Sequence, residues 1–379
     1  MVGAYVLGTA ADYIGRRKAL IISVVILTVG ALLTAFSWDV VSLAIFRALT
    51  GIGMGAQIAL AGTVMTEMAP TRLRGKGVSY NVVAGGLGLA VAPFIGILLL
   101  GTGADGWRFV LGLGALSVIL LPFMTDRWFP ESPRWLVLHG QENRARAIIA
   151  QMEEHARRAS GQELPPVREE PSEHTMEHFP TAELLRRPYV GRLAVVLLFW
   201  IFHYMAAYAY LAFAPTILIK MGLSQPSGLL YSALGDLMFP VGALVAAFVA
   251  DRWQRKNLVA LAELIGIVGI AVLALAHSPL ALVVGGLVAG FWILFSVSFA
   301  YPYTAEVFPT RARASAMSIG DGLGHLGGAI QPYIVVAALA SIGARGTWWV
   351  IAAMLAVALA LIFFGGLPTK DEGLTEIAQ

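Results

Sequence analysis

The chain has 379 residues, of which 58% are hydrophobic and 13% are charged, and its mean hydropathy is +0.75. A soluble domain of this composition has too few polar side chains to cover its surface, so the composition indicates a polytopic membrane protein. The net charge of +3 comes from basic residues in short loops between apolar runs, which argues against a nucleic-acid partner, and the absence of cysteine excludes disulfides and thiolate metal sites.

Ten apolar runs are each close to the roughly 20 residues that a helix needs to cross a membrane. A shorter apolar run at 1–11 precedes them, which gives about 11 segments, five before and six after a polar region at 128–190. The ten full runs lie at 19–37, 41–65, 78–101, 107–125, 193–218, 228–250, 257–276, 280–303, 315–340 and 347–367. We predict an all-α membrane protein with half bundles over 1–127 and 191–379, joined by a linker over 128–190.

The first loop, GTAADYIGRRK at 8–18, has the form of the turn that follows a membrane helix, yet only seven residues precede it. Six segments in each half would be the symmetric number, and the first half has five. We therefore expect a functional protein of this kind to begin with roughly 40 to 60 additional residues, because one more span and its flanks must come first.

The basic residues predict how the chain crosses the membrane. Of the 26 Lys and Arg residues, 22 lie in alternate loops, including ten arginines between Arg127 and Arg192. Because basic loops face the cytoplasm, we expect the linker and the C-terminus to be cytoplasmic and the protein to lie in the inner (plasma) membrane. Within the linker, apolar residues at helical spacing among charges predict an amphipathic helix over about 133–158.

An internal repeat relates the two halves. The segments TEMAPTRLRGKGVS at 66–79 and AEVFPTRARASAMS at 305–318 share Glu, Pro, Thr, two Arg and Ser at the same spacing, so Glu67 and Glu306 are 239 residues apart. The same shift carries Asp12 onto Asp251, Arg16 onto Arg255, Gly85 onto Gly324 and Pro93 onto Pro332. One shift that serves separate loops indicates two parallel homologous halves, the arrangement of carriers that rock around a central site.

These motifs resemble those of the major facilitator superfamily, and the resemblance extends over the whole chain. Its loop motif between the second and third helices is matched by Gly8, Asp12, Gly15, Arg16 and Arg17. The R-x-x-x-G-x-G-x-G motif of its fourth helix is matched by Arg47, Gly51, Gly53 and Gly55. PESPRWL at 130–136 resembles the branch that contains sugar porters, niacin-type carriers and synaptic-vesicle-type carriers. The resemblance implies two pseudo-symmetric six-helix bundles, with the first helix missing from this chain, and transport by alternating access.

The charged loops predict a gate on the cytoplasmic side. Asp12, with Arg16 and Arg17 after it, is placed to pair with a neighbouring helix end when this side is closed, and such pairs would act as a latch. The predicted gate consists of Gly8, Asp12, Gly15, Arg16 and Arg17, the pairs Glu67 with Arg74 and Glu306 with Arg313, and Asp251 with Arg255. The alternative is that these charges anchor the helices at the lipid headgroups or enforce topology.

Ionisable residues inside spans are costly and are therefore candidates for function. Asp321 and His325 lie four residues apart on one helix face, where an aspartate beside a histidine can carry a proton. In proton-coupled relatives of the superfamily, the arginine at the position of Arg47 faces a carboxylate on the first helix. We predict proton coupling through Arg47, Asp321 and His325, and the alternative for the last two is a polar pair that bridges two helices. For Glu263, an interfacial pair with the basic residues at 255–256 is the better explanation.

Two aromatic segments predict the surface that contacts the solute. They are FWIFHYMAAYAYLAF at 199–213 and GFWILFSVSFAYPY at 290–303. Stacking surface with a few hydroxyl and imidazole groups suits a small planar organic solute. The predicted binding residues are Trp200, His203, Tyr204, Tyr208, Phe291, Trp292 and Phe295. The alternative is that many of them face lipid or form an interfacial belt.

We predict a secondary active transporter that moves a small organic solute, such as an aromatic or nicotinate-like carboxylate, together with protons. The alternatives are a sugar porter, a drug or metabolite efflux carrier, and a membrane sensor that does not transport. We expect no enzyme activity, no cofactor and no metal, because the sequence has no nucleophile-elbow, metal-ligand or phosphate-loop spacing. We expect the protein to contact membrane lipid and to act as a monomer.

Overall fold

The computed structural model describes residues 2–68, 74–161, 181–249, 253–308 and 312–369, and in these ranges the protein consists of helices and the turns between them, with no β-strand. Within them, ten helical stretches are long and apolar enough to cross a membrane. Their order along the chain matches the ten predicted spans, which confirms the prediction of an all-α membrane protein.

The chain divides into two compact units. Unit 1 comprises Met1–Tyr80 and Leu98–Ser172, and unit 2 comprises Asn81–Ile97 and Glu173–Gln379. The helices of unit 1 are α1 (Val2–Ile14), α2 (Arg16–Ala35), α3 (Val40–Met68), α5 (Gly106–Gly112), the 3-10 helix η2 (Leu113–Phe123), α6 (Pro133–Leu138) and α7 (Glu142–Ser160), and α4 (Arg74–Leu100) contributes to both units. The half-bundle boundaries at 127 and 191 stay a prediction.

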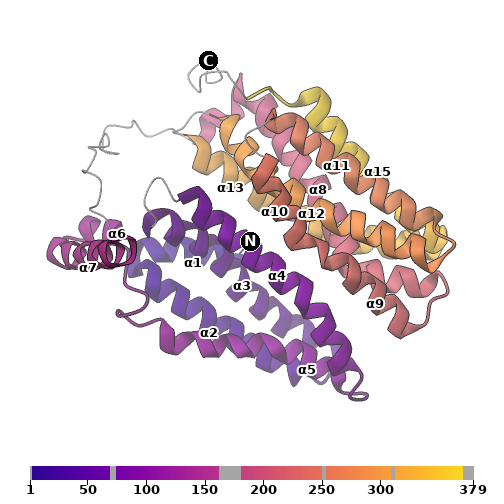
Figure 1. Cartoon of the computed structure of the whole chain (residues 1–379), viewed down its shortest axis with the longest axis horizontal. Helices are drawn as coiled ribbons and strands as arrows, with labels where there is room; N and C mark the ends of the chain where they lie inside the picture. The colour runs from indigo at the N-terminus through magenta and orange to yellow at the C-terminus, as the bar shows by residue number, and fades with distance from the viewer. Residues whose placement is uncertain (1, 69–73, 162–180, 250–252, 309–311, 370–379) are drawn as a thin grey trace. The chain divides into compact units, whose positions relative to one another are not determined.

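In unit 1, helices α2 and α3 lie side by side and α1 packs against both (Figure 1). A Cβ on Gly53 would lie 2.6 Å from the backbone nitrogen of Leu27, so a glycine of the R-x-x-x-G-x-G-x-G motif lets α3 approach the backbone of α2. This close packing brings the start of α2 next to the end of α3, where the charged loop residues are concentrated.

Unit 2 holds the larger hydrophobic core. Its helices are the 3-10 helix η4 (Thr181–Leu185), α8 (Tyr189–Lys220), α9 (Gln225–Asp236), α10 (Met238–Val249), α11 (Arg255–Leu275), α12 (Pro279–Glu306), α13 (Arg313–Gly324), α14 (Leu326–Ser341) and α15 (Gly343–Gly365). Helices α8, α11, α12 and α15 enclose the core, and the indoles of Trp200, Trp292 and Trp348 are completely buried in it. Burial of large aromatic side chains of this kind fixes the spacing of these four helices.

Two spans of unit 2 are interrupted, although the sequence predicted each as one helix. The span Gln225–Val249 consists of α9 and α10, and the span Ser315–Ser341 contains α14 and most of α13. Interrupted membrane helices free backbone groups and mark ligand sites in transporters. Asp236 ends α9, and Asp321 and His325 lie at the junction of α13 with α14.

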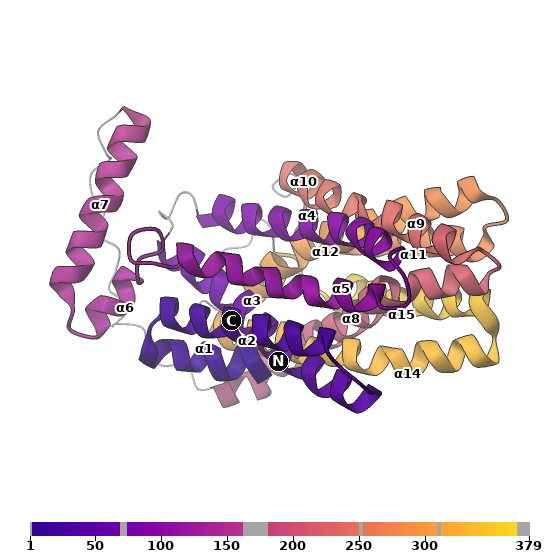
Figure 2. The same ribbon diagram turned by 90° about the horizontal axis from the view of Figure 1, so that it is seen from below.

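The predicted amphipathic helix over 133–158 is wrong as a single element. The structure has two helices there, α6 and α7, which lie at one end of unit 1 (Figure 2). Ser132 caps α6, because its hydroxyl accepts a hydrogen bond from the backbone of Trp135 at 3.4 Å. Gly140, with a φ of 71°, turns the chain between the two helices, a conformation that glycine adopts without strain.

Candidate functional site

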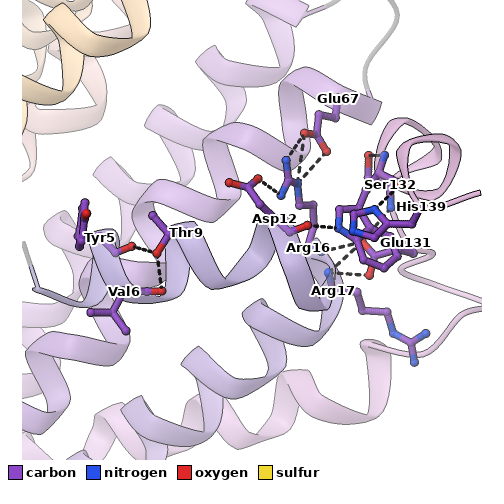
Figure 3. Close-up of polar contacts among 11 residues, drawn as sticks. Tyr5, Val6, Thr9, Asp12, Arg16, Arg17, Glu67, Glu131, Ser132 and His139 are labelled. Atoms are coloured by element: carbon purple, nitrogen blue, oxygen red, sulfur yellow. Dashed lines mark hydrogen bonds and ion pairs between the residues drawn. The ribbon is translucent and has the colours of Figure 1, made fainter. Parts of the chain in front are cut away.

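In unit 1, charged side chains from three helices meet at Arg16, the first residue of α2 (Figure 3). Its guanidinium nitrogen Nη1 lies 2.5 Å from Oδ1 of Asp12 on α1, and Nη2 lies 3.0 Å from Oε1 of Glu67 on α3. Arg16 and Glu67 keep 14% and 13% of their side-chain surface accessible, so this pair is screened less than a surface ion pair. We call Asp12, Arg16, Arg17, Glu67 and Glu131 the first-loop network.

Glu131 of the PESPRWL motif caps the start of α2. Its Oε1 accepts hydrogen bonds from the backbone nitrogens of Arg16 at 2.8 Å, Arg17 at 3.2 Å and Ser132 at 3.0 Å. The first backbone N–H groups of a helix have no partner within the helix, and a carboxylate there also complements the helix dipole. From the sequence, this motif indicated the family and no role for Glu131, although a glutamate in a matched motif was a signal of one.

Gly15 makes room for the Glu131 carboxylate. Its φ of 98° and ψ of 153° belong to a backbone region that is essentially restricted to glycine. A Cβ at this position would lie 2.3 Å from Oε2 of Glu131. Gly8, the other glycine of the loop motif, differs, because a Cβ there would have no atom within 4 Å.

Arg17 ties α2 to the segment that follows η2. Its Nε donates to the carbonyl oxygen of Met124 at 2.8 Å, and its Nη1 forms an ion pair with Asp126. Arg144 of α7 reaches the same carboxylate, with Nη2 at 3.0 Å from Oδ1. The hydrogen bond from Arg17 is the main reason why the pKa of Asp126 lies below its ordinary value.

Unit 2 repeats the ion pair of Arg16 with Glu67 at the predicted shift of 239 residues. Arg255 Nε lies 2.5 Å from Oε1 of Glu306, as Arg16 pairs with Glu67. Lys256 Nζ donates to the carbonyl oxygen of Gly366 at 2.8 Å, as Arg17 bonds the Met124 carbonyl. Asp251 and the side chains of Arg74 and Arg313 lie outside the described residues.

Arginines also bind the carbonyl oxygens at the C-terminal ends of α2 and α11, the far ends from the ion pairs. Arg108 Nη1 donates to the carbonyl oxygens of Ala35 at 2.8 Å and Ser37 at 2.7 Å, just beyond the last turn of α2. In unit 2, Arg345 Nη2 donates to the carbonyl oxygen of Ala276 at 3.2 Å. The last carbonyls of a helix lack partners within it, so a cation there satisfies them and complements the helix dipole.

In unit 2, Asp321 is the centre of a polar cluster at the junction of α13 and α14. Its Oδ1 accepts hydrogen bonds from the hydroxyls of Tyr204 at 2.5 Å and Tyr301 at 2.9 Å. His325 Nδ1 lies 2.8 Å from the Asp321 carbonyl oxygen and 4.0 Å from Oδ1. We call these four residues the Asp321 cluster. The side chains of Asp321 and His325 remain 28% and 34% accessible, so these two members of the cluster are only partly buried in unit 2.

Other predicted binding residues lie deeper. Trp200, His203 and Trp292 are completely buried, whereas Tyr208 and Phe291 are partly exposed. Tyr204 and Phe295 are buried in unit 2, with 8% and 4% accessibility. Tyr204 nevertheless reaches the Asp321 cluster through its hydroxyl. The indole of Trp200 stacks on the Tyr204 ring, with the two ring centroids 5.1 Å apart.

The prediction that Glu263 pairs with the basic residues at 255–256 is wrong. Glu263 is completely buried, and its Oε1 lies 2.9 Å from His203 Nδ1 and accepts a hydrogen bond from the Ser296 hydroxyl at 2.6 Å. Side chains from α8 and α12 therefore bind one oxygen of a buried carboxylate of α11, whose Oε2 has no hydrogen-bond partner among the described residues. His203 thus belongs to a buried polar contact in this structure.

Arg47 lies exposed on α3 and forms no hydrogen bond or ion pair with any residue that the structure describes. Within the same described ranges, no group of three or more His, Asp or Glu side chains is arranged to hold a metal ion. The ionisable groups that the structure brings together inside spans are therefore the Asp321 cluster and the buried contact of His203 with Glu263.

The chain is similar to known membrane transporters. The family model described as "Sugar (and other) transporter" matches residues 1–379. Inner membrane metabolite transport protein YdjE of Escherichia coli strain K12 is 27% identical over 387 residues, which cover 100% of this chain and 84% of that protein. The gallate transporter of Pseudomonas putida is 30% identical over 353 residues, which cover 90% of this chain and 75% of that protein. The solved structure of XylE, a proton:xylose symporter of the major facilitator superfamily from E. coli, matches with a TM-score of 0.69 and 20% identity over 99% of this chain and 85% of that one.

Proposed function

This chain belongs to the sugar (and other) transporter family, and from that premise we propose that it is a proton-coupled secondary transporter of a small aromatic carboxylate. Its fold is that of the major facilitator superfamily, and the family is one of transporters rather than enzymes. The observation that carries the proposal is the Asp321 cluster, where a carboxylate, two phenols and an imidazole meet at an interrupted membrane span.

The chemistry of the cluster links solute binding to protonation. Two unit negative charges 4 Å apart repel by about 4 kcal/mol at the effective dielectric of a protein surface. A solute carboxylate therefore binds beside Asp321 much better when that side chain is protonated. Once protonated, Asp321 can donate a hydrogen bond to the solute while its other oxygen still accepts from Tyr204 and Tyr301. Binding of the anion then requires binding of a proton, which is the requirement for symport.

The aromatic neighbours favour a planar solute. The rings of Tyr204 and His325 lie 4.1 Å apart, and the Tyr208 ring lies 5.7 Å from Tyr204 and 6.0 Å from His325. Aromatic faces with polar edges bind aromatic acids by stacking and hydrogen bonding. The likeness to a gallate transporter supports this class of solute, because gallate is an aromatic carboxylate.

The repeated ion pairs support alternating access. Arg16 with Glu67 and Arg255 with Glu306 each join helix ends within one unit, so each unit keeps its helices together at that end. Two such units that move as bodies around a central site give the rocking motion of this class of carrier. We place the ion pairs on the cytoplasmic side of the plasma (inner) membrane, because the basic loops carry them.

Uptake into proteoliposomes tests the proposed function. Purified protein should accumulate radiolabelled gallate when the outside is acidic, and accumulation should cease when a protonophore removes the gradient. Xylose is the comparison, because the similar solved structure belongs to a xylose symporter. Xylose uptake without gallate uptake would favour the sugar porter, and gallate accumulation driven by an acidic lumen would favour an efflux carrier. Gallate binding without any flux would favour a sensor.

Arg16→Ala and Arg255→Ala should each slow transport of the solute by about tenfold, while the solute Kd changes by less than about threefold. Each change removes an ion pair that joins two helix ends within one unit and that includes no member of the Asp321 cluster, so we expect it to act on conformational exchange rather than on binding. Stopped-flow exchange and equilibrium binding on the same preparations measure the two quantities.

Arg158→Ala on α7 is the matched control for these variants. It removes an exposed arginine that is paired with Glu154 at 2.8 Å within one helix, and it should leave both exchange and binding unchanged. A collapse of affinity in Arg16→Ala with a normal exchange rate of bound solute would contradict the assignment.

A further inference from the structure

Asp236, the last residue of α9, is a buried carboxylate that none of the contacts above uses. It lies inside the span Gln225–Val249 and keeps only 8% of its surface accessible. Its Oδ1 is completely buried without a hydrogen-bond partner, and no described residue forms an ion pair with it. Buried polar groups nearly always have partners, and acidic groups within spans are costly, so this side chain requires an explanation.

A proline accompanies the helix break at Asp236. Pro240 lies four residues further along and has no backbone N–H, so the Asp236 carbonyl oxygen loses its α-helical hydrogen-bond donor. Accordingly, α9 ends at Asp236 and α10 begins at Met238. A carboxyl group and a carbonyl oxygen without a helical donor therefore belong to the same residue in the middle of a membrane span.

The end of α9 is packed against α8 and α12 without space for a second polar group from those helices. A Cβ on Gly235 would lie 2.4 Å from the Tyr210 hydroxyl oxygen and 2.8 Å from the Gly286 carbonyl oxygen. The Tyr210 hydroxyl donates to that carbonyl at 3.2 Å. Tyr210 is the titratable side chain that interacts electrostatically with Asp236, and its single proton donor is already used.

The other elements beside the break offer no charge to balance a carboxylate. Helix α10 contains no titratable residue, and neither does the part of α4 at 82–97, where Gly86 approaches Pro240. On α9 itself, Tyr231 is the nearest titratable residue, and on α12 the first is Tyr301, about four turns beyond Gly286. No Lys, Arg or His among the described residues pairs with Asp236.

We propose that Asp236 is a proton-binding site of unit 2. An ionised carboxylate with neither a cation nor a hydrogen-bond donor is strongly disfavoured in a membrane-embedded core, so the side chain holds a proton in the conformation described here. When water reaches the break, the carboxyl O–H bond breaks, the proton passes to that water and a carboxylate remains. Proton binding at Asp236 stands apart from the solute, and only its contribution to coupling rests on the proposed function.

Infrared spectroscopy of the purified protein in lipid tests proton binding directly. At neutral pH we expect a carbonyl stretch of a protonated carboxylic acid that shifts when aspartate is labelled with ¹³C and that is absent in Asp236→Asn. Asp321→Asn should retain this band. If Asp236→Asn does not fold, Asp236→Glu provides the second test, because its acid band should lose the aspartate isotope shift. An aspartic acid band that persists in Asp236→Asn, or no such band in the unmodified protein, would overturn the proposal.

The ratio of protons to solute tests the contribution to coupling. In proteoliposomes, Asp236→Asn should lower the number of protons that enter with each gallate by one, as measured with a pH dye and labelled gallate together. An unchanged ratio in Asp236→Asn would show that the Asp236 proton is not exchanged during transport. If gallate is not transported at all, the proposed function fails, and the infrared result still decides whether Asp236 binds a proton.

Discussion

Asp321→Asn is expected to lower the accumulation of solute that an acidic exterior drives by about tenfold per pH unit of the gradient, while exchange of solute between the two sides continues. Asparagine keeps an oxygen that accepts the hydrogen bonds of Tyr204 and Tyr301, so the geometry of the cluster is preserved. It cannot bind or release a proton. A gradient of one pH unit supports about tenfold accumulation per proton, so loss of the Asp321 proton removes that factor and leaves the contribution of Asp236.

The measurement compares gradient-driven uptake with exchange at equal pH in the same proteoliposomes. Tyr301→Phe is the matched control, because it removes one hydrogen bond to Asp321 and leaves the titratable group in place. This variant should bind solute more weakly and still accumulate it. Undiminished pH-driven accumulation in Asp321→Asn would remove Asp321 from the coupling mechanism.

Gly15→Ala is expected to destabilise unit 1 by about 3–5 kcal/mol, a loss that is exceptional for one substitution. The backbone conformation alone costs roughly 1–3 kcal/mol for a residue with a Cβ. The new methyl group would also lie only 2.3 Å from Oε2 of Glu131, which is too close for two non-bonded atoms. The carboxylate must therefore leave the start of α2. Thermal unfolding of the purified protein in detergent, followed by circular dichroism, measures the loss.

Gly8→Ala is the control for this prediction, because it changes another glycine of the same loop motif. A Cβ at Gly8 meets nothing within 4 Å, and the residue lies inside α1, where alanine is favoured over glycine by up to about 1 kcal/mol. Gly8→Ala should therefore unfold at the same temperature or slightly higher. Equal unfolding temperatures for the two variants would mean that Glu131 is not held as the structure places it.

The spans could be predicted from sequence because their signal is local. A run of apolar residues long enough to cross a membrane is visible without knowing what it packs against. The partners of the charged residues are not local. Arg16 and Glu67 are separated by 51 residues, and Tyr204 and Asp321 by 117, so sequence proximity suggested other pairings. The repeat places Arg255 and Glu306 at the positions that correspond to Arg16 and Glu67, and the structure pairs them in both halves, although the sequence suggested Arg74 and Arg313 as the partners of the two glutamates.

The interruption of spans was beyond sequence reasoning for a physical reason. Pro240 accompanies the break between α9 and α10, yet Pro93, Pro215 and Pro302 lie inside helices that continue. A proline in a membrane helix frees a carbonyl group, and whether the helix then breaks depends on the neighbouring helices and side chains. The sequence does not give those neighbours, so a proline by itself does not locate a break.

The arginine contacts at the far ends of α2 and α11 bear on how two duplicated halves diverge. Arg108 and Arg345 are 237 residues apart, while their acceptors Ala35 and Ala276 are 241 apart, so neither keeps the register of 239. Every residue type has a backbone carbonyl, so a hydrogen bond from arginine to a carbonyl can be kept when insertions or deletions change which residue supplies it. An ion pair to a glutamate has no such freedom, and Glu67 and Glu306 have stayed in register. Alignment of the halves therefore detects the glutamate pairs and overlooks the carbonyl contacts, although both connect α2 and α11 to neighbouring helices.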